Sequence, residues 1–128
     1  PNEFKGYSDE SWGLTASDNY QGYSAHSPTN DLGVITPTAA LSSFPYTPIE
    51  STRALEHFYY DKNEDLWGPY GFYDAFSEEF NWVADGYLAI DQGPIVAMIE
   101  NYRSQLLWNL FMQDPDVQNG LNILEFNY

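Results

Sequence analysis

The sequence GPIVAMIENYRSQLLWNLFM, residues 93–112, is apolar on nearly every side when it is wound into a helix. Gly93-Pro94 predicts the start, because proline is tolerated at the first position of a helix. One apolar stripe follows the 3.6-residue period and a second lies opposite it; together they contain Ile95, Val96, Met98, Ile99, Tyr102, Leu106, Leu107, Trp108, Leu110 and Phe111. A helix of this kind is normally buried between layers. The stretch therefore predicts a long helix that other elements must surround.

Three further helix starts are marked by a capping residue followed by proline. They predict helices near residues 37–43, 48–61 and 115–124, and Thr47 with Glu50 resembles a capping box at the second of them. The remaining stretches, 1–35 and 62–92, have few regular periods apart from short strands expected at 33–35 and 86–90. The sequence thus predicts an all-α fold with long functional loops and a few short strands.

The composition of the chain limits the kinds of partner that we expect it to bind. The chain has 128 residues, a formal net charge of −15, 18 % aromatic residues and no cysteine. A surface so acidic repels phosphate backbones and anionic membranes, so we expect neither a nucleic-acid partner nor membrane insertion. Aromatic faces beside carboxylates and amides are instead typical of sites that bind sugars.

The motifs of common cofactor and metal sites do not occur. No phosphate-binding loop or dinucleotide fingerprint is present. His26 and His57 are isolated, and residues 61–72 lack the glycine and the final glutamate of a calcium loop. We therefore expect no cofactor and no metal. His57 is expected to be a packed histidine, and Glu100 and Arg103 an ion pair on the long helix.

Carboxylates among aromatic rings are the remaining candidates for chemistry. In LWGPYGFYDAFS, residues 66–77, Gly68, Pro69 and Gly71 break any helical period, so its rings are expected on a loop around Asp74. Asp91 stands just before the Gly93-Pro94 helix start. Each acid has a structural alternative, because Asp91 could cap the helix and Asp74 could bond loop amides.

A third irregular stretch, SWGLTASDNYQGY, contributes Trp12 and Asp18. The alternative for Trp12 is that it fills a gap in the core. Each of the three stretches is a weak signal alone, but three loops that combine aromatic rings with an acid favour a sugar-binding cleft.

Five motifs resemble one family in order along the chain: WGLTASD (12–18), ITPTAAL (35–41), LWGPYGFYDAF (66–76), YLAIDQGPI (87–95) and MIENYRSQLLWNLFM (98–112). This is the bacterial glucoamylase-like family, which includes endo-β-1,2-glucanases and is similar to a domain of cyclic β-1,2-glucan synthases. The resemblance implies an (α/α)6 barrel, of which residues 1–128 would form the C-terminal portion, with the N-terminal helices absent from this chain.

The resemblance also implies a glycoside hydrolase that acts on glucans. Asp91 and Asp74 would be the catalytic candidates, Asp91 as a base or a ligand of water or sugar and Asp74 as a group that supports the site or binds sugar. The general acid would lie in the missing part of the barrel, and whether the enzyme inverts or retains the anomeric configuration stays open. The residues expected to bind substrate are Trp12, Asp18, Trp67, Tyr70, Phe72, Tyr73 and Gln92. The expected partners are a glucan oligosaccharide and the rest of the barrel, without which the chain would be inactive. A periplasmic or secreted location is implied as well.

Two other classes of function stay open at this point. Aromatic loops also bind sugars without hydrolysis, so the chain could be a carbohydrate-binding or structural module. A phosphorylase or a transglycosylase could use the same scaffold, and either would be recognised by a requirement for phosphate or by products longer than the substrate.

Overall fold

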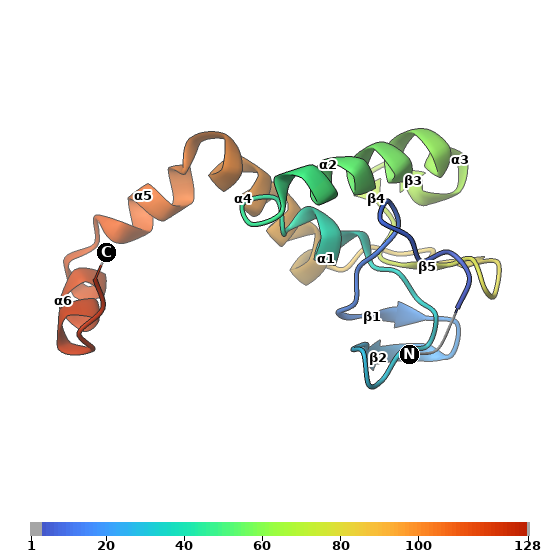
Figure 1. Cartoon of the computed structure of the whole chain (residues 1–128), viewed down its shortest axis with the longest axis horizontal. Helices are drawn as coiled ribbons and strands as arrows, with labels where there is room; N and C mark the ends of the chain where they lie inside the picture. Colours follow the sequence, from blue (N-terminus) through green and yellow to red (C-terminus); the bar gives the residue numbers. More distant parts are fainter. Residues whose placement is uncertain (1–3, 128) are drawn as a thin grey trace.

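The computed structural model describes residues 4–127. Figure 1 shows a compact part that contains the strands and the first helices, and an arm of two helices that extends away from it. Along the chain the elements are β1(Ala16–Asn19), β2(Gly22–Ala25), α1(Pro37–Leu41), α2(Pro48–Glu56), η1(His57–Asp61), α3(Asn63–Leu66), β3(Trp67–Gly68), β4(Gly71–Phe72), β5(Phe76–Ser77), β6(Trp82–Val83), α4(Ala89–Ser104), α5(Leu106–Met112) and α6(Pro115–Ile123).

The core lies between α1, α2 and the β4–β5 region. Phe58 is fully buried, and its ring meets those of Phe72 and Phe76 edge to face with centroids 6.1 and 5.6 Å apart. The other buried members are Ile35, Ala40, Leu41, Phe44, Ala54 and Leu66. Helix α1 packs against both α2 and α4, so this core fixes where α4 begins.

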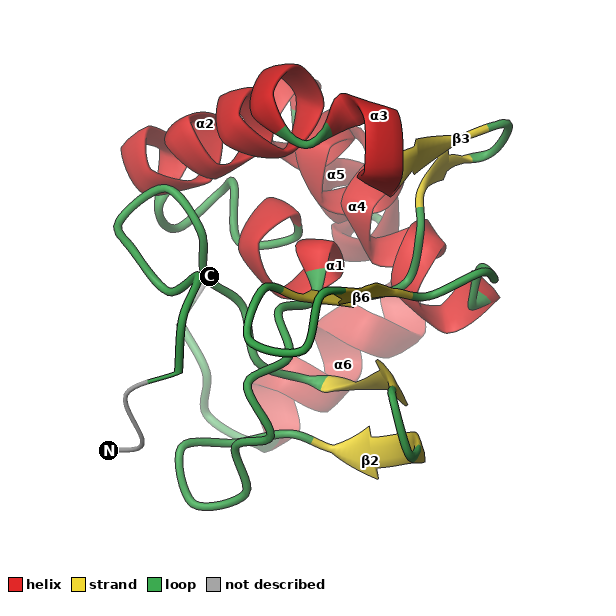
Figure 2. Cartoon of the chain, turned by 90° about the vertical axis from the view of Figure 1, so that its right-hand side faces the viewer, coloured by secondary structure: helices red, strands yellow, loops and turns green. Residues whose placement is uncertain are grey.

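The predicted all-α class, and with it the assignment to an (α/α)6 barrel, is wrong for this chain. Three antiparallel strand pairs, β1–β2, β3–β4 and β5–β6, stand between the helices. Figure 2 shows α2 and the β1–β2 hairpin on opposite sides of the molecule. Two pairs have strands of two residues each, which is too short for an alternating pattern to show in a sequence. Of the strands predicted, 86–90 is absent, and Ile35 forms a single bridge to Phe76.

The predicted helices near 37–43, 48–61 and 115–124 are confirmed, with small differences at their ends. The second runs through α2 and continues as the π-helical turn η1. The capping box at Thr47 is wrong, because the Thr47 hydroxyl donates to the Ser43 carbonyl oxygen at 3.2 Å instead. Asp114 does cap α6, accepting from the amides of Asp116 and Val117.

The long helix predicted over 93–112 differs from the structure in three ways. It begins at Ala89, because the amides of Asp91 and Gln92 both bond to the Leu88 carbonyl oxygen and neither bond needs the amide that Pro94 lacks. It is interrupted at Gln105, which has a left-handed conformation with φ 59°. It is also not buried on all sides, since the side chains of α5 are largely exposed.

Two local predictions about the helices are borne out. His57 bonds to Asp61 at 2.9 Å on its own helix, and Arg103 pairs with Glu100 at 3.3 Å. In the part of the chain that the structure describes, no helix combines the length and the apolar character needed to cross a membrane.

Candidate active site

Asp91 lies in the first turn of α4, where the core holds it in place. Its side chain is buried, and the Thr38 hydroxyl of α1 donates to its backbone oxygen at 2.6 Å. The Asp91 amide donates to the Leu88 carbonyl oxygen at 3.0 Å. The carboxylate does not serve as a side-chain cap for α4. The structural alternative for Asp91 was that it caps the helix or complements its dipole: the cap is absent, whereas the position of Asp91 in the first turn of α4 does suit the helix dipole.

Asp74 lies between β4 and β5 and is more deeply buried, at 1 % exposure. Its Oδ2 accepts the backbone amide of Asp18 at 2.8 Å, and its own amide donates to the Gly86 carbonyl oxygen at 3.1 Å. These two bonds join three segments that are far apart in the sequence. The Asp74 carboxylate is thereby held beside β1 and beside the segment that leads into α4.

The two carboxyl groups meet. Asp74 Oδ1 and Asp91 Oδ2 are buried and accept no hydrogen bond from the donors that the structure describes. Burial, together with a hydrogen bond to Asp74 and the charge of Asp74, raises the pKa of Asp91 to about 7. The Asp91 carboxyl is therefore protonated in a larger fraction of molecules near neutral pH than the carboxyl of an ordinary aspartate.

Asp18 completes the cluster from β1. Its side chain is partly exposed, and the pKa of its carboxyl is raised, first by desolvation and then by the charges of Asp74 and Asp85. The charge of Asp18 in turn adds to the rise in the pKa of Asp91. Three acids from three separate segments thus interact at one place. Carboxylates whose environments separate their pKa values are typical of acid–base sites.

The cluster faces open space on two sides. Asp91 lines a groove of about 220 Å³ together with Thr38 and Tyr23, and Asp18 lines one of about 580 Å³. Both are within or near the size range of small-molecule sites. A ligand can therefore reach Asp91 from one side and Asp18 from the other.

The aromatic residues predicted to bind substrate are distributed over three environments. Trp12 packs against the core, and Phe72 is buried within it. Trp67, Tyr70 and Gln92 line a separate, mainly apolar groove of about 450 Å³. Tyr73 stacks on Tyr87 with centroids 5.0 Å apart. The structure thus brings together the predicted acids, and it places the predicted rings elsewhere.

The density of rings in residues 66–77 has a structural explanation. The stretch forms the β3–β4 hairpin, in which Trp67 pairs with Phe72 and Gly68 with Gly71. A Cβ at Gly68 would lie 2.0 Å from the Tyr87 hydroxyl and 2.8 Å from the Tyr73 ring. Glycine is required there because two tyrosines pack against the hairpin backbone.

Sequence reasoning missed three groups beside the cluster, Asn19, Trp82 and Asp85, which line the groove at Asp18. Tyr23, which belongs to the third irregular stretch, lines the same groove, and the register of the β1–β2 hairpin places it opposite Asp18. Trp82 and Asp85 belong to a hairpin and loop too short to recognise in advance.

Comparison with known proteins gives the family. Residues 1–115 match the family Glycoamylase, described as "Putative glucoamylase". The chain belongs to this family. The expectation drawn from the five motifs is thereby confirmed at the level of the family, although the fold class attached to it is not.

Relatives within the family have more specific names. The chain is 48 % identical over 124 residues to an exo β-1,2-glucooligosaccharide sophorohydrolase (non-reducing end) of Parabacteroides distasonis, covering 95 % of this chain and 17 % of that protein. A solved endo-β-1,2-glucanase from Chitinophaga pinensis, in complex with sophorotriose and glucose, is 61 % identical with a TM-score of 0.91. A structure with the family's own description, from Bacteroides uniformis, is 62 % identical with a TM-score of 0.93.

The match covers nearly all of this chain but a minor part of those proteins. It includes 94 % of this chain and 29 % of each of the two solved chains. The chain thus spans less than a third of the length of the relatives that it matches.

Proposed function

We propose that the protein to which this chain belongs is a glycoside hydrolase that cleaves β-1,2-linked glucan chains, with Asp91 as its general base. The observation that carries the proposal is the buried Asp74–Asp91 pair, which opens on a groove. The names of the relatives support the substrate class, because they are β-1,2-glucan-degrading enzymes.

The pair suits the role of a base. Glycosidases use two carboxyl groups, of which one protonates the leaving oxygen and the other activates water. The ionised Asp91 would take a proton from the water as the water oxygen attacks the anomeric carbon, and the leaving oxygen would receive its proton from an acid outside residues 1–128. The raised pKa makes Asp91 a stronger proton acceptor than an ordinary aspartate.

This role predicts the shape of the pH profile. A base has to be ionised, so kcat/KM should rise with pH through the pKa of Asp91 in the free protein, which is about 7. A general acid has to be protonated, so the same group in that role would give a rate that falls above that pH. A fall at higher pH would report the general acid outside residues 1–128, so the result that would contradict Asp91 as the base is a rate that does not rise with pH near 7.

The decisive experiment is the substitution Asp91→Asn in the full-length protein. We expect a loss of turnover on β-1,2-glucan oligosaccharides of about 100-fold or more, because the base contributes typically 10²–10⁴-fold. Asp114→Asn is the matched control, since Asp114 is an exposed aspartate that caps α6 and asparagine caps equally well. Turnover of Asp91→Asn near the wild-type rate would remove Asp91 from the mechanism.

The same assay decides between the other classes of function. Products longer than the substrate would indicate a transglycosylase, and a requirement for phosphate would indicate a phosphorylase. Binding of the oligosaccharide without any product would indicate a binding module. Each of these results would overturn hydrolysis as the activity.

We also propose that the chain is the C-terminal part of a larger catalytic domain whose remainder covers the arm. Support comes from the exposure of apolar side chains on α5 and α6, such as Leu110 and Phe111 at 57 and 62 %. The isolated chain should then aggregate or bind a hydrophobic dye, and co-expressed preceding segments should suppress both. A sharp two-state melt of the isolated monomer would contradict this. The periplasmic or secreted location stays a prediction, which fractionation of the source cells would test.

A further inference from the structure

A groove next to Asp18 has features of a sugar site that the proposed mechanism does not use. It has a volume of about 580 Å³ and lies between the β1–β2 hairpin and β6 with the loop that follows. Its wall contains two aromatic rings, those of Tyr23 and Trp82, and two carboxylates, those of Asp18 and Asp85. The volume is within the range of about 300–1,000 Å³ that small-molecule sites occupy.

The hairpin presents its side chains to this groove in a defined order. The register places Asp18 opposite Tyr23 and Asn19 opposite Gly22, and side chains opposite one another share a face of the sheet. The Tyr23 ring is 58 % exposed and therefore available for stacking. Nothing lies within 4 Å of the position that a Cβ would occupy at Gly22, so the backbone beside the groove is open.

The side-chain amide of Asn19, the residue after Asp18 in β1, is buried. Asn19 is 5 % exposed, and its Oδ1 accepts the amide of Gln21 at 2.8 Å. Its Nδ2 is buried and donates to no acceptor among residues 4–127. Successive residues of a strand point to opposite faces, so the side chain of Asn19 lies on the face of β1 opposite to that of Asp18, and the proposal does not use it.

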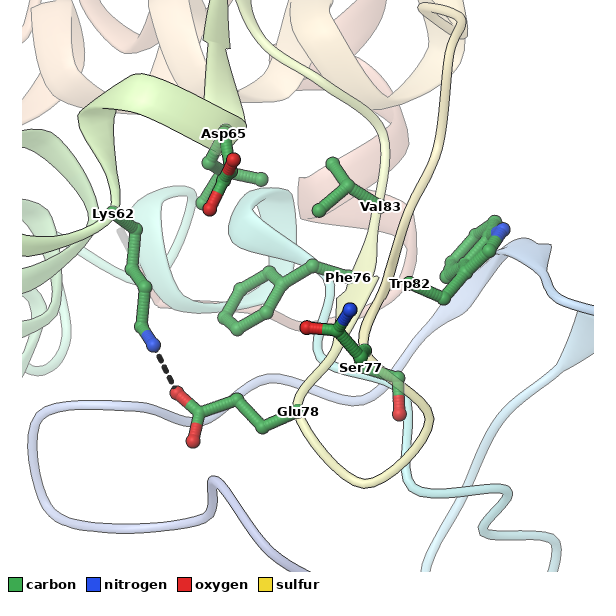
Figure 3. Close-up of a pocket in the computed structure, with 9 residues that line it drawn as sticks. Lys62, Asp65, Phe76, Ser77, Glu78, Trp82 and Val83 are labelled. Atoms are coloured by element: carbon green, nitrogen blue, oxygen red, sulfur yellow. Dashed lines mark ion pairs between the residues drawn. The ribbon is translucent and has the colours of Figure 1, made fainter.

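Trp82 lines this groove and also borders a second pocket next to the β5–β6 hairpin. Figure 3 shows that second pocket, where Lys62 pairs with Glu78 while the indole of Trp82 points away from both. The pocket has a volume of about 170 Å³ and contains Asp65 in its wall. It provides a matched region for control variants.

The groove and the proposed catalytic groove are neighbours that share one wall residue, Tyr23. Tyr23 lines both the 580 Å³ groove at Asp18 and the 220 Å³ groove at Asp91. A chain of sugar units that passes over Tyr23 would therefore reach Asp91 on one side and Trp82 on the other.

We propose that the groove formed by Asp18, Tyr23, Trp82 and Asp85 binds a glucose unit of the substrate next to the unit that is cleaved at Asp91. This inference rests on the proposed function for the identity of the sugar. The rings stack on the apolar faces of the unit, and the two carboxylates accept its hydroxyl groups. Hydroxyl donors also relieve the repulsion between Asp18 and Asp85, which in the free protein helps to raise the pKa of Asp18.

The test compares variants of the full-length protein in this groove and in the second pocket. Trp82→Ala and Asp85→Asn should each raise KM for β-1,2-linked oligosaccharides, Trp82→Ala about tenfold, with little change in kcat, because an aromatic contact contributes about 0.5–1.5 kcal/mol. Trp82→Phe should retain most of the affinity. The matched control Asp65→Asn, which removes a charge from the pocket of Figure 3, should leave KM unchanged.

Calorimetric titration of β-1,2-linked glucotriose in the Asp91→Asn background measures binding without turnover. Equal affinity in Trp82→Ala, Asp85→Asn and the parent would overturn the subsite, as would a similar loss in Asp65→Asn. If Trp82→Ala does not fold, the Asp85→Asn and Trp82→Phe comparison still decides. If the wild-type protein binds the trisaccharide through Trp82 but does not hydrolyse it, the subsite stands and the proposed function is overturned instead.

Discussion

The compact part and the helical arm of this chain use the same kinds of residue in opposite ways. Phe58 in η1 is fully buried at the centre of the core, whereas Phe111 in α5 is 62 % exposed. Figure 1 shows the arm, α5 and α6, extending away from the part that contains the strands. Apolar side chains hold the three carboxylates together in the compact part. In the arm they are exposed to solvent and have no comparable role within the chain.

This difference shows which part of the chain positions the candidate site. The acids are positioned by hydrogen bonds inside the compact part, from Thr38 to Asp91 and from Asp18 to Asp74. The arm contributes no residue to this cluster. The site's geometry should therefore tolerate changes in the arm far better than changes in the core.

The largest expected effect tests this contrast with a pair of identical substitutions. Phe58→Ala should lower the free energy of unfolding by about 3–5 kcal/mol, because it removes a buried ring from the centre of the core. Phe111→Ala in the same chain should change it by less than about 0.5 kcal/mol. Urea denaturation followed by circular dichroism measures both. A large effect of Phe111→Ala in the isolated chain would show that the arm is already packed.

Phe111→Ala also tests the proposal that the arm is covered in the full-length protein. There, Phe111→Ala should cost about 2 kcal/mol or more, because a covered ring would be lost from a closed interface. An unchanged stability of Phe111→Ala in the full-length protein would mean that nothing covers this face.

A middle-sized effect is expected where the N-terminal loop meets α1. A Cβ at Gly13 would lie 2.6 Å from the Thr36 carbonyl oxygen, and Gly13 has φ +138°. Gly13→Ala should therefore cost about 2–4 kcal/mol, from the clash and from the unfavourable backbone conformation together. Gly22→Ala is the matched control, with φ +135° and no neighbour within 4 Å, and should cost only about 1–2 kcal/mol. Equal losses in thermal melts would show that the contact with Thr36 is unimportant.

The sequence predicted the elements that local chemistry specifies and missed those that depend on distant contacts. Proline with a capping residue marked Pro37, Pro48 and Pro115 correctly as helix starts. The helix start predicted at Pro94 was wrong, because α4 begins at Ala89. Its first turn is held by hydrogen bonds to the Leu88 carbonyl oxygen, which no local sequence pattern predicts. The break at Gln105 was missed for a similar reason. The side chain of the buried Asn101 accepts the amides of Leu107 and Trp108 and so starts α5 anew.

The candidate site was predictable in its acids and not in its rings. Asp18, Asp74 and Asp91 stand beside aromatic motifs, and the structure brings all three together. The motifs could not reveal which rings face the acids, because this depends on the pairing of two-residue strands. Phe72 belongs to the core and lines the apolar groove of Trp67 and Tyr70 rather than a groove at the acids, whereas Trp82 was overlooked and lines the groove at Asp18.

The smallest expected effect concerns the pH dependence of stability in the compact part. The pKa of Asp91 is raised from an ordinary 3.8 to about 7 in the folded chain. Between these values the folded state binds more protons than the unfolded state, so the free energy of unfolding should fall as the pH rises from about 4 to 7. Asp91→Asn removes this titration, and the variant should be more stable than the parent at pH 8 and little changed at pH 4.

The gain should be smaller than the loss described for Phe58, because Asp91 lines an open groove whose solvent screens its charge from those of Asp74 and Asp18. Melting temperatures of parent and variant across this pH range measure it, with Asp114→Asn as the exposed control. A variant that gained stability at pH 8 while losing turnover would show that the pair is kept for chemistry at the expense of stability. A variant less stable than the parent at every pH would show that Asp91 holds the fold together, and the contrast between a site-forming core and a solvent-exposed arm would then need a structural role for the acids as well.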